Sequence, residues 1–244
     1  MNSLEPPVIA TPASHRFSLF LKIGGICLLI ALLHVPLALL RGVLKERQGY
    51  QLAATDEIAG IWGRQQLVIG PVLAIPYQYK KPVVKSKVVN GRAVQVEETE
   101  LTEALAYFLP EVLAVNGSID PEVRHRGIYE AVVYSTKVSL AGNFQPDFAV
   151  AGIEADRIEW EKAQVQFGVS DLHGIRSIGP VQLNGGKGHA FESVENDNGI
   201  WSLKAKLDGL PSTSKFDFAF EVALQGSGRF EVAPVGKVTT VLLS

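Results

Sequence analysis

The apolar residues of this chain follow two different patterns, and the change between them comes near residue 67. From Ile23 to Leu40 the sequence reads IGGICLLIALLHVPLALL, eighteen residues without a formal charge. As a helix this stretch is roughly 27 Å long, close to the ~30 Å hydrocarbon thickness of a bilayer. Lys22, at its start, can extend its ammonium group to the headgroups. The pattern predicts a transmembrane helix over residues 17–43.

A cleaved signal peptide is the alternative for this apolar stretch. The apolar region of such a peptide usually has ~7–15 residues and ends at a small-x-small cleavage site. Here Arg41 follows the run directly, and no alanine pair occurs before Ala53 and Ala54. We therefore favour an uncleaved anchor.

On either side of the span the pattern is weaker. Residues 1–16, MNSLEPPVIATPASHR, have no periodicity and predict a disordered tail. After the span, apolar residues recur at three- and four-residue steps and predict an amphipathic helix over residues 44–66. We expect its apolar stripe to pack on the following domain; a helix lying in the headgroup layer is the alternative. The stripe consists of Tyr50, Ala54, Ile58, Ile61 and Trp62.

From Leu67 onward the period changes to two, which is typical of half-buried strands. In FDFAFEVAL, Phe216, Phe218 and Phe220 face one way, whereas Asp217 and Glu221 face the other. The same alternation occurs in residues 132–140, 164–169 and 201–207. The predicted fold class is therefore mainly β, with an antiparallel sandwich-like domain over residues 67–244.

The strongest local signal is the pair Asn90-Gly91, between VVKSKVV and RAVQVEE. This pair tolerates the two positive φ angles of a type I′ turn. It predicts a β-hairpin over residues 83–98.

Charge and cysteine content exclude some function classes. Residues 41–244 carry 21 basic and 24 acidic side chains, so their surface gives no reason to expect nucleic acid as a partner. The single cysteine, Cys27, lies inside the span, so no disulfide can form within the chain. The basic residues that flank the span do not decide which side of the membrane the domain occupies.

Residues that could carry chemistry are scattered. Ser170, Asp171 and His173 lie close together in FGVSDLHGIRSIGP, but neighbouring residues cannot take the three roles of a hydrolytic triad. The nucleophile-elbow pattern also fails, because Leu172 replaces its second glycine. We interpret this segment as a polar turn between strands.

Glycines and histidines do not add a convincing site. NGGKGHAF lies between strands, whereas a phosphate-binding loop needs a helix after it, so we interpret it as a flexible connection. No two of the five histidines are spaced to share a helix or strand face, and we assign no metal ligand. They are His15, His34, His125, His173 and His189.

His34 needs separate consideration because an intramembrane imidazole is a candidate for a proton relay or for a bond to another helix. A neutral histidine near one end of the span, in contact with headgroups or a partner helix, is the interpretation that we favour. We therefore assign no catalytic, cofactor-binding or metal-ligating residue.

Four sequence blocks occur in collinear order and together resemble one family. They are IGPVLAIPY, FLPE, GIYEAVVY and GIRSIGP. On these blocks the chain, from about Leu21 to Ser244, resembles the CreD family of bacterial inner-membrane proteins linked to cell-envelope integrity. The resemblance implies a cytoplasmic tail and a periplasmic β domain.

Family members are roughly twice as long, so the resemblance is to their N-terminal half. It implies that the β domain continues beyond Ser244 in such proteins. On that basis we expect GRFEVAPVGKVTTVLLS to leave an apolar strand edge unpaired, which favours aggregation of residues 41–244 expressed alone.

The leading hypothesis is a non-enzymatic inner-membrane protein that supports envelope integrity or the stress response. Its β domain would bind or brace a partner, and its expected partners are the lipid bilayer and other envelope or inner-membrane proteins, with no cofactor. One alternative is a hydrolase acting on envelope material through His125, Asp171 and His173. Another is a lipid- or ligand-binding module with a cavity between its sheets.

Overall fold

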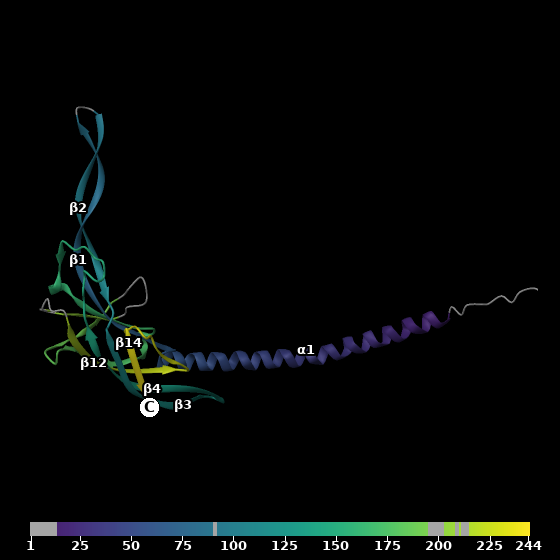
Figure 1. Ribbon diagram of the computed structural model, residues 1–244. Helices are drawn as coiled ribbons and strands as arrows, with labels where there is room; N and C mark the ends of the chain where they lie inside the picture. Colours follow the sequence, from purple (N-terminus) through teal and green to yellow (C-terminus); the bar gives the residue numbers. More distant parts are fainter. Residues whose placement is uncertain (1–13, 90–91, 195–202, 208–209, 211–214) are drawn as a thin grey trace, which may run out of the picture. The chain divides into compact units, whose positions relative to one another are not determined.

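The computed structural model describes residues 14–89, 92–194, 203–207, 210 and 215–244 (Figure 1). The chain forms two compact units, Met1–Ala54 and Thr55–Ser244. We call the second unit the β body.

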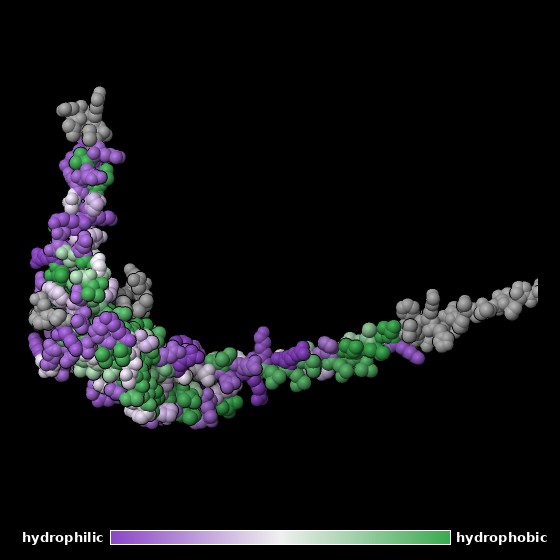
Figure 2. All heavy atoms as spheres, in the orientation of Figure 1, coloured by the Kyte–Doolittle hydropathy of each residue, from purple (hydrophilic) through white to green (hydrophobic). Residues whose placement is uncertain are grey.

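One long helix, α1 (Ser14–Trp62), contains the predicted span. It is the only helix in the described part of the chain that is long and apolar enough to cross a membrane. In the first unit its side chains from Leu21 onward are largely exposed, and Figure 2 shows the apolar ones as a green stretch. Because exposed leucine and isoleucine side chains are unfavourable in water, a bilayer is the environment that this part of α1 requires.

The helix differs from its prediction at both ends. Ser14, His15 and Arg16 are helical rather than part of a disordered tail, since a helix nucleated in the apolar span extends through them. Residues 1–13 lie outside the described residues. At the other end, α1 stops at Trp62, where Gly63 takes a φ of +83° that ends the helix.

Two mixed sheets make up the β body. The first has the order β10-β11-β6-β1-β13, with β2 and β5 also on β1. Its strands are β1 (Gln66–Val89), β2 (Arg92–Phe108), β5 (Arg157–Ile158), β6 (Gln164–Val169), β10 (Phe191–Ser193), β11 (Leu203–Lys206) and β13 (Phe230–Val232).

The second sheet has the order β14-β3-β4-β12-β8-β9, with β7 on β12. Its strands are β3 (Val112–Arg126), β4 (Tyr129–Phe144), β7 (Ile175–Ile178), β8 (Val181–Leu183), β9 (Gly188–His189), β12 (Phe216–Ser227) and β14 (Val238–Leu243). Two short 3₁₀ helices, η1 (Trp160–Lys162) and η2 (Leu172–Gly174), flank β6.

The core lies between the two sheets, which confirms the mainly β, sandwich-like prediction. Along β12 the predicted alternation holds, since Phe216, Phe218 and Phe220 are buried. Aromatic pairs join the layers: the rings of Phe167 and Phe220 are 5.2 Å apart and edge-to-face, a favourable geometry.

The sequence predicted antiparallel pairing throughout, but the structure also contains two parallel strand pairs. β1 pairs with β13 in parallel, and β3 pairs with β14 in parallel. A parallel pair needs a long crossover connection. In both pairs the chain between the two strands is long and forms much of the β body.

The predicted hairpin over residues 83–98 is confirmed and is longer than expected. Its ladder runs from Leu73 opposite Phe108 to Val89 opposite Arg92; the turn residues Asn90 and Gly91 lie outside the described residues. Beyond Gln78 and Glu103, toward the turn, no other described strand pairs with β1 or β2. We call this two-stranded extension, residues 79–89 and 92–102, the ribbon (Figure 1).

Candidate functional site

The predicted polar turn at Ser170–His173 ties the end of β6 to the start of β1. The hydroxyl of Ser170 donates to the carbonyl of Gln65 (2.8 Å) and accepts from the N–H of Leu67 (2.9 Å). Both hydrogen-bonding capacities of this hydroxyl therefore serve the backbone. It is not directed at His173, as a nucleophile in a triad would be.

Asp171 and His173 do come together, but as a cap. Asp171 accepts from the backbone N–H groups of His173 (2.9 Å) and Arg64 (3.2 Å), and its Oδ1 lies 3.0 Å from Nδ1 of His173. Burial alone would raise the pKa of Asp171, but these hydrogen bonds lower it further than burial raises it. The carboxylate is therefore held ionised as the cap of η2, and the His173 side chain is 85% exposed.

Beneath this turn lies a tightly packed group that the sequence did not indicate. We call Gly63, Gln66, Tyr134, Gly174 and Gln225 the helix-base junction. Gln66 and Gln225 are 1% and 5% exposed, and their Oε1 atoms have no hydrogen-bond partner in the described part of the chain. Burial raises the pKa of Tyr134 to about 12, and its hydroxyl donates to the carbonyl of Arg229 (2.7 Å). This phenol stays neutral and has a structural role.

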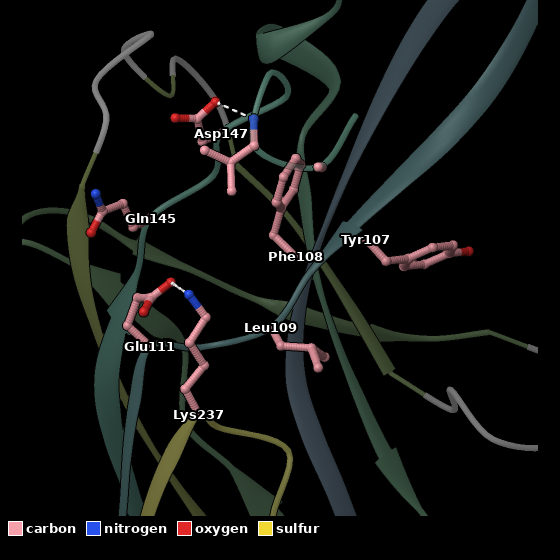
Figure 3. Close-up of a pocket in the computed structure, with 9 residues that line it drawn as sticks. Tyr107, Phe108, Leu109, Glu111, Gln145, Asp147 and Lys237 are labelled. Atoms are coloured by element: carbon pink, nitrogen blue, oxygen red, sulfur yellow. Dashed lines mark hydrogen bonds and ion pairs between the residues drawn. The ribbon is translucent and has the colours of Figure 1, made fainter. Parts of the chain in front are cut away.

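A cleft of about 530 Å³ opens at the edge of the β body (Figure 3). Residues from the end of β2, the connection between β2 and β3, the segment after β4 and the residue before β14 line it. They are Tyr107, Phe108, Leu109, Glu111, Gln145, Asp147, Val150, Ala151 and Lys237.

The charged groups of the cleft are already paired. Glu111 and Lys237 form an ion pair of 2.6 Å, and Oδ1 of Asp147 accepts from the N–H groups of Ala149 (2.9 Å) and Val150 (3.0 Å). Apolar side chains remain exposed around them: Tyr107 and Leu109 are each 53% exposed and Val150 is 83% exposed. The cleft can therefore receive apolar groups, but it presents no free acid–base pair.

A second pocket, of about 340 Å³, lies between the last turns of α1 and the end of the β3–β4 hairpin. Its cations are engaged. The Arg124 guanidinium lies 4.7 Å from the centre of the Trp62 ring, and Arg126 pairs with Glu57 at 2.5 Å. His125 lies 3.6 Å from the Glu130 carboxylate. Because these groups face local partners, the pocket is better suited to holding the hairpin on the helix than to binding an anion.

Only part of the predicted apolar stripe on the helix contributes to that contact. Ile58 is buried, but Ile61 is 68% exposed.

The structure does not gather the predicted histidines. His125 lies at the β3–β4 hairpin, His173 on η2 and His189 on β9, and among the described residues no three metal-ligating side chains form a cluster. In α1, His34 Nδ1 lies 3.0 Å from the Ile30 carbonyl within the same helix. Within NGGKGHAF, residues 184–187 connect β8 to β9 and Gly188 and His189 form β9; Asn184 and Gly185 have positive φ angles.

A family model described as Inner membrane protein CreD matches residues 18–244. The chain belongs to the CreD family. It is 26% identical over 231 residues to the Inner membrane protein CreD of Escherichia coli (strain K12), a match that covers 93% of this chain and 48% of that relative. The chain thus spans about half the length of the curated relative, and no solved structure matches it. Membership of the CreD family confirms the predicted resemblance, and with the apolar helix it supports location in the inner membrane.

Proposed function

We propose that this chain is a non-enzymatic protein of the inner membrane that supports cell-envelope integrity, with a β body that binds or braces a partner. The observation that carries the proposal is the hydrogen bonding of Ser170 and Asp171. The polar side-chain atoms of both residues bond to backbone groups around η2 and β1, and the cleft presents apolar surface instead of reactive groups.

Triple replacement of His125, His173 and His189 by Gln tests the proposal that the chain is non-enzymatic. We expect complementation of the envelope phenotype to be unchanged, because none of the three belongs to an assembled site. Immunoblotting of the membrane fraction must show normal abundance. A triple variant that is abundant and folded but fails to complement would favour a hydrolase.

We further propose that the β body lies in the periplasm and the amino-terminal tail in the cytoplasm. Family membership and one apolar span before the β body support this orientation. A phosphatase reporter fused after Asn116 should be active, because it folds only when exported, and a cytoplasmic reporter at the same position should be silent. The opposite pair of activities would reverse the orientation and leave the non-enzymatic proposal intact.

The cleft favours a second candidate, a binder of an apolar ligand or peptide. Its volume is in the range of small-molecule sites, and exposed Tyr107, Leu109 and Val150 surround it. Val150→Asp should then weaken binding of an apolar fluorescent probe to the full chain at least fivefold. Ile128→Asp, at a similarly exposed residue remote from the cleft lining, is the matched control.

A further inference from the structure

Three basic residues follow the apolar span of α1 within two helical turns. Arg41 comes directly after Leu40, and Lys45 and Arg47 lie roughly 6 and 9 Å farther along the helix axis. All three side chains are exposed, and Figure 2 shows hydrophilic residues of α1 next to its apolar stretch. We call Arg41, Lys45 and Arg47 the juxtamembrane cluster.

The juxtamembrane cluster lies at the depth of the lipid headgroups. The headgroup layer is roughly 5–8 Å thick on each side of the hydrocarbon core. The Cα–Cβ bonds of a helix tilt toward its amino terminus, and in α1 that direction leads back to the span. Lipid phosphates are therefore the anions that these side chains meet first, whichever side of the membrane the β body occupies.

The described carboxylates of α1 do not neutralise the juxtamembrane cluster. Asp56 and Glu57 form ion pairs within the β body. Glu46 is one or five residues from each member of the cluster, and helical side chains meet at spacings of three or four. Its Oε1 accepts from the hydroxyl of Tyr50 (3.3 Å), which lies one turn farther from the span.

Arg41 and Lys45 stand four residues apart, a spacing at which like charges on a helix repel each other. An anion between them removes this repulsion, and both side chains donate to phosphate oxygens. We propose that Arg41 and Lys45 together bind the phosphate of an anionic phospholipid and that Arg47 adds to the attraction. A zwitterionic lipid binds less well, because its own cation offsets its phosphate.

Native mass spectrometry of the full chain tests this lipid preference. The chain is released from micelles that contain equal amounts of phosphatidylglycerol and phosphatidylcholine. We expect about fivefold more phosphatidylglycerol than phosphatidylcholine on the unmodified chain. Replacing all three residues of the juxtamembrane cluster by Gln should bring the ratio close to one. A ratio of one on the unmodified chain would overturn the proposal.

A triple variant of the β body is the matched control. Lys81→Gln, Arg176→Gln and Lys187→Gln remove the same number of positive charges from exposed residues. This variant should keep the preference for phosphatidylglycerol. Circular dichroism must show the same helix and β signals in both triple variants. Equal loss of the preference in both would mean that it reflects net charge, and would overturn the site.

A second measurement uses a bilayer and separates the members of the cluster. The full chain is reconstituted in phosphatidylcholine vesicles with a trace of spin-labelled phosphatidylglycerol, and electron spin resonance gives the fraction of label immobilised by the protein. This fraction should exceed that of spin-labelled phosphatidylcholine. The excess should fall as salt rises from about 0.05 to about 0.5 M, because salt screens exposed charges.

Arg41→Gln with Lys45→Gln should remove most of this excess, whereas Arg47→Gln alone should leave more than half of it. An excess that does not respond to salt would contradict an electrostatic site. Equal loss in the double variant and in Arg47→Gln would contradict a phosphate held between Arg41 and Lys45.

Discussion

Gly174 is the position in the helix-base junction with least room for a side chain. A Cβ there would lie 2.3 Å from Nε2 of Gln66 and 2.6 Å from the backbone carbonyl oxygen of Gln225. The glutamine side chain can shift, but the carbonyl belongs to β12. Overpacking of this kind costs roughly 1–3 kcal/mol of stability.

We therefore predict that Gly174→Ala lowers the thermal midpoint of the full chain by several degrees, at about 2–4 °C per kcal/mol for a domain of this size. Loss of the β circular-dichroism signal in detergent measures it. Gly179→Ala is the control, since its Cβ would meet its nearest neighbour at an ordinary 3.5 Å. Equal midpoints for the two variants would show that the junction adjusts freely.

Asp171 makes the stability of the same region depend on pH. Its pKa is lowered from 3.8 in the folded chain, so its contribution is present above pH 3.8 and is lost as the pH falls through the folded value. Asp171→Asn should be less stable than the unmodified chain at pH 7, and the gap should close below about pH 4. Urea unfolding at a series of pH values tests this. A gap independent of pH would mean that the carboxylate charge contributes nothing.

At the scale of elements, the ribbon is the part of the β body with least support. An isolated two-stranded hairpin is marginally stable in water. One face carries a cross-strand ion network in which Lys85 pairs with Glu98 and Glu100, and Lys87 pairs with Glu98. Hydrogen bonding from Lys87 lowers the pKa of Glu98, and hydrogen bonding to Glu100 raises the pKa of Lys85.

Lys85→Glu would place three carboxylates on that face. We expect amide exchange in the ribbon to accelerate about three- to tenfold, because the cross-strand attraction is lost and repulsion between carboxylates replaces it. The thermal midpoint of the β body should hardly change. Ser86→Glu, on the opposite ribbon face, is the control in deuterium-exchange mass spectrometry. Equal acceleration in both variants would exclude the ion network as the cause.

Elements with a local signal could be predicted from the sequence. The pair Asn90-Gly91 predicted the hairpin whose strands pair up to Val89 opposite Arg92, and the alternation in β12 follows from residues two apart. The length of β1 could not be predicted, because Pro76 and Pro82 argue against a continuous strand. In the structure Pro76 lies opposite Leu105, and its carbonyl accepts from the N–H of Glu159 (2.9 Å), so the strand continues through it.

At the scale of the whole molecule, the features that could not be predicted from the sequence are those built from distant segments. The helix-base junction joins residues near 63, 134, 174 and 225, and the cleft joins β2, the β4 exit and Lys237. No periodicity or local spacing links such positions. The apolar span and the family blocks, by contrast, are continuous in sequence, which is why membrane attachment and family could be predicted while the cleft could not.

The parallel pairs β1–β13 and β3–β14 also govern how the chain is made. Gln66 pairs with Phe230, roughly 160 residues later, and Val112 pairs with Val238. At about 5–20 residues per second, a ribosome needs on the order of 10–30 s to deliver these partners. Until then, β1 and β3 each lack one neighbour. Contacts so far apart in sequence also form slowly. The order in which strands leave the ribosome, as well as their stability once paired, therefore decides how long a nascent chain is open to misfolding and chaperone capture.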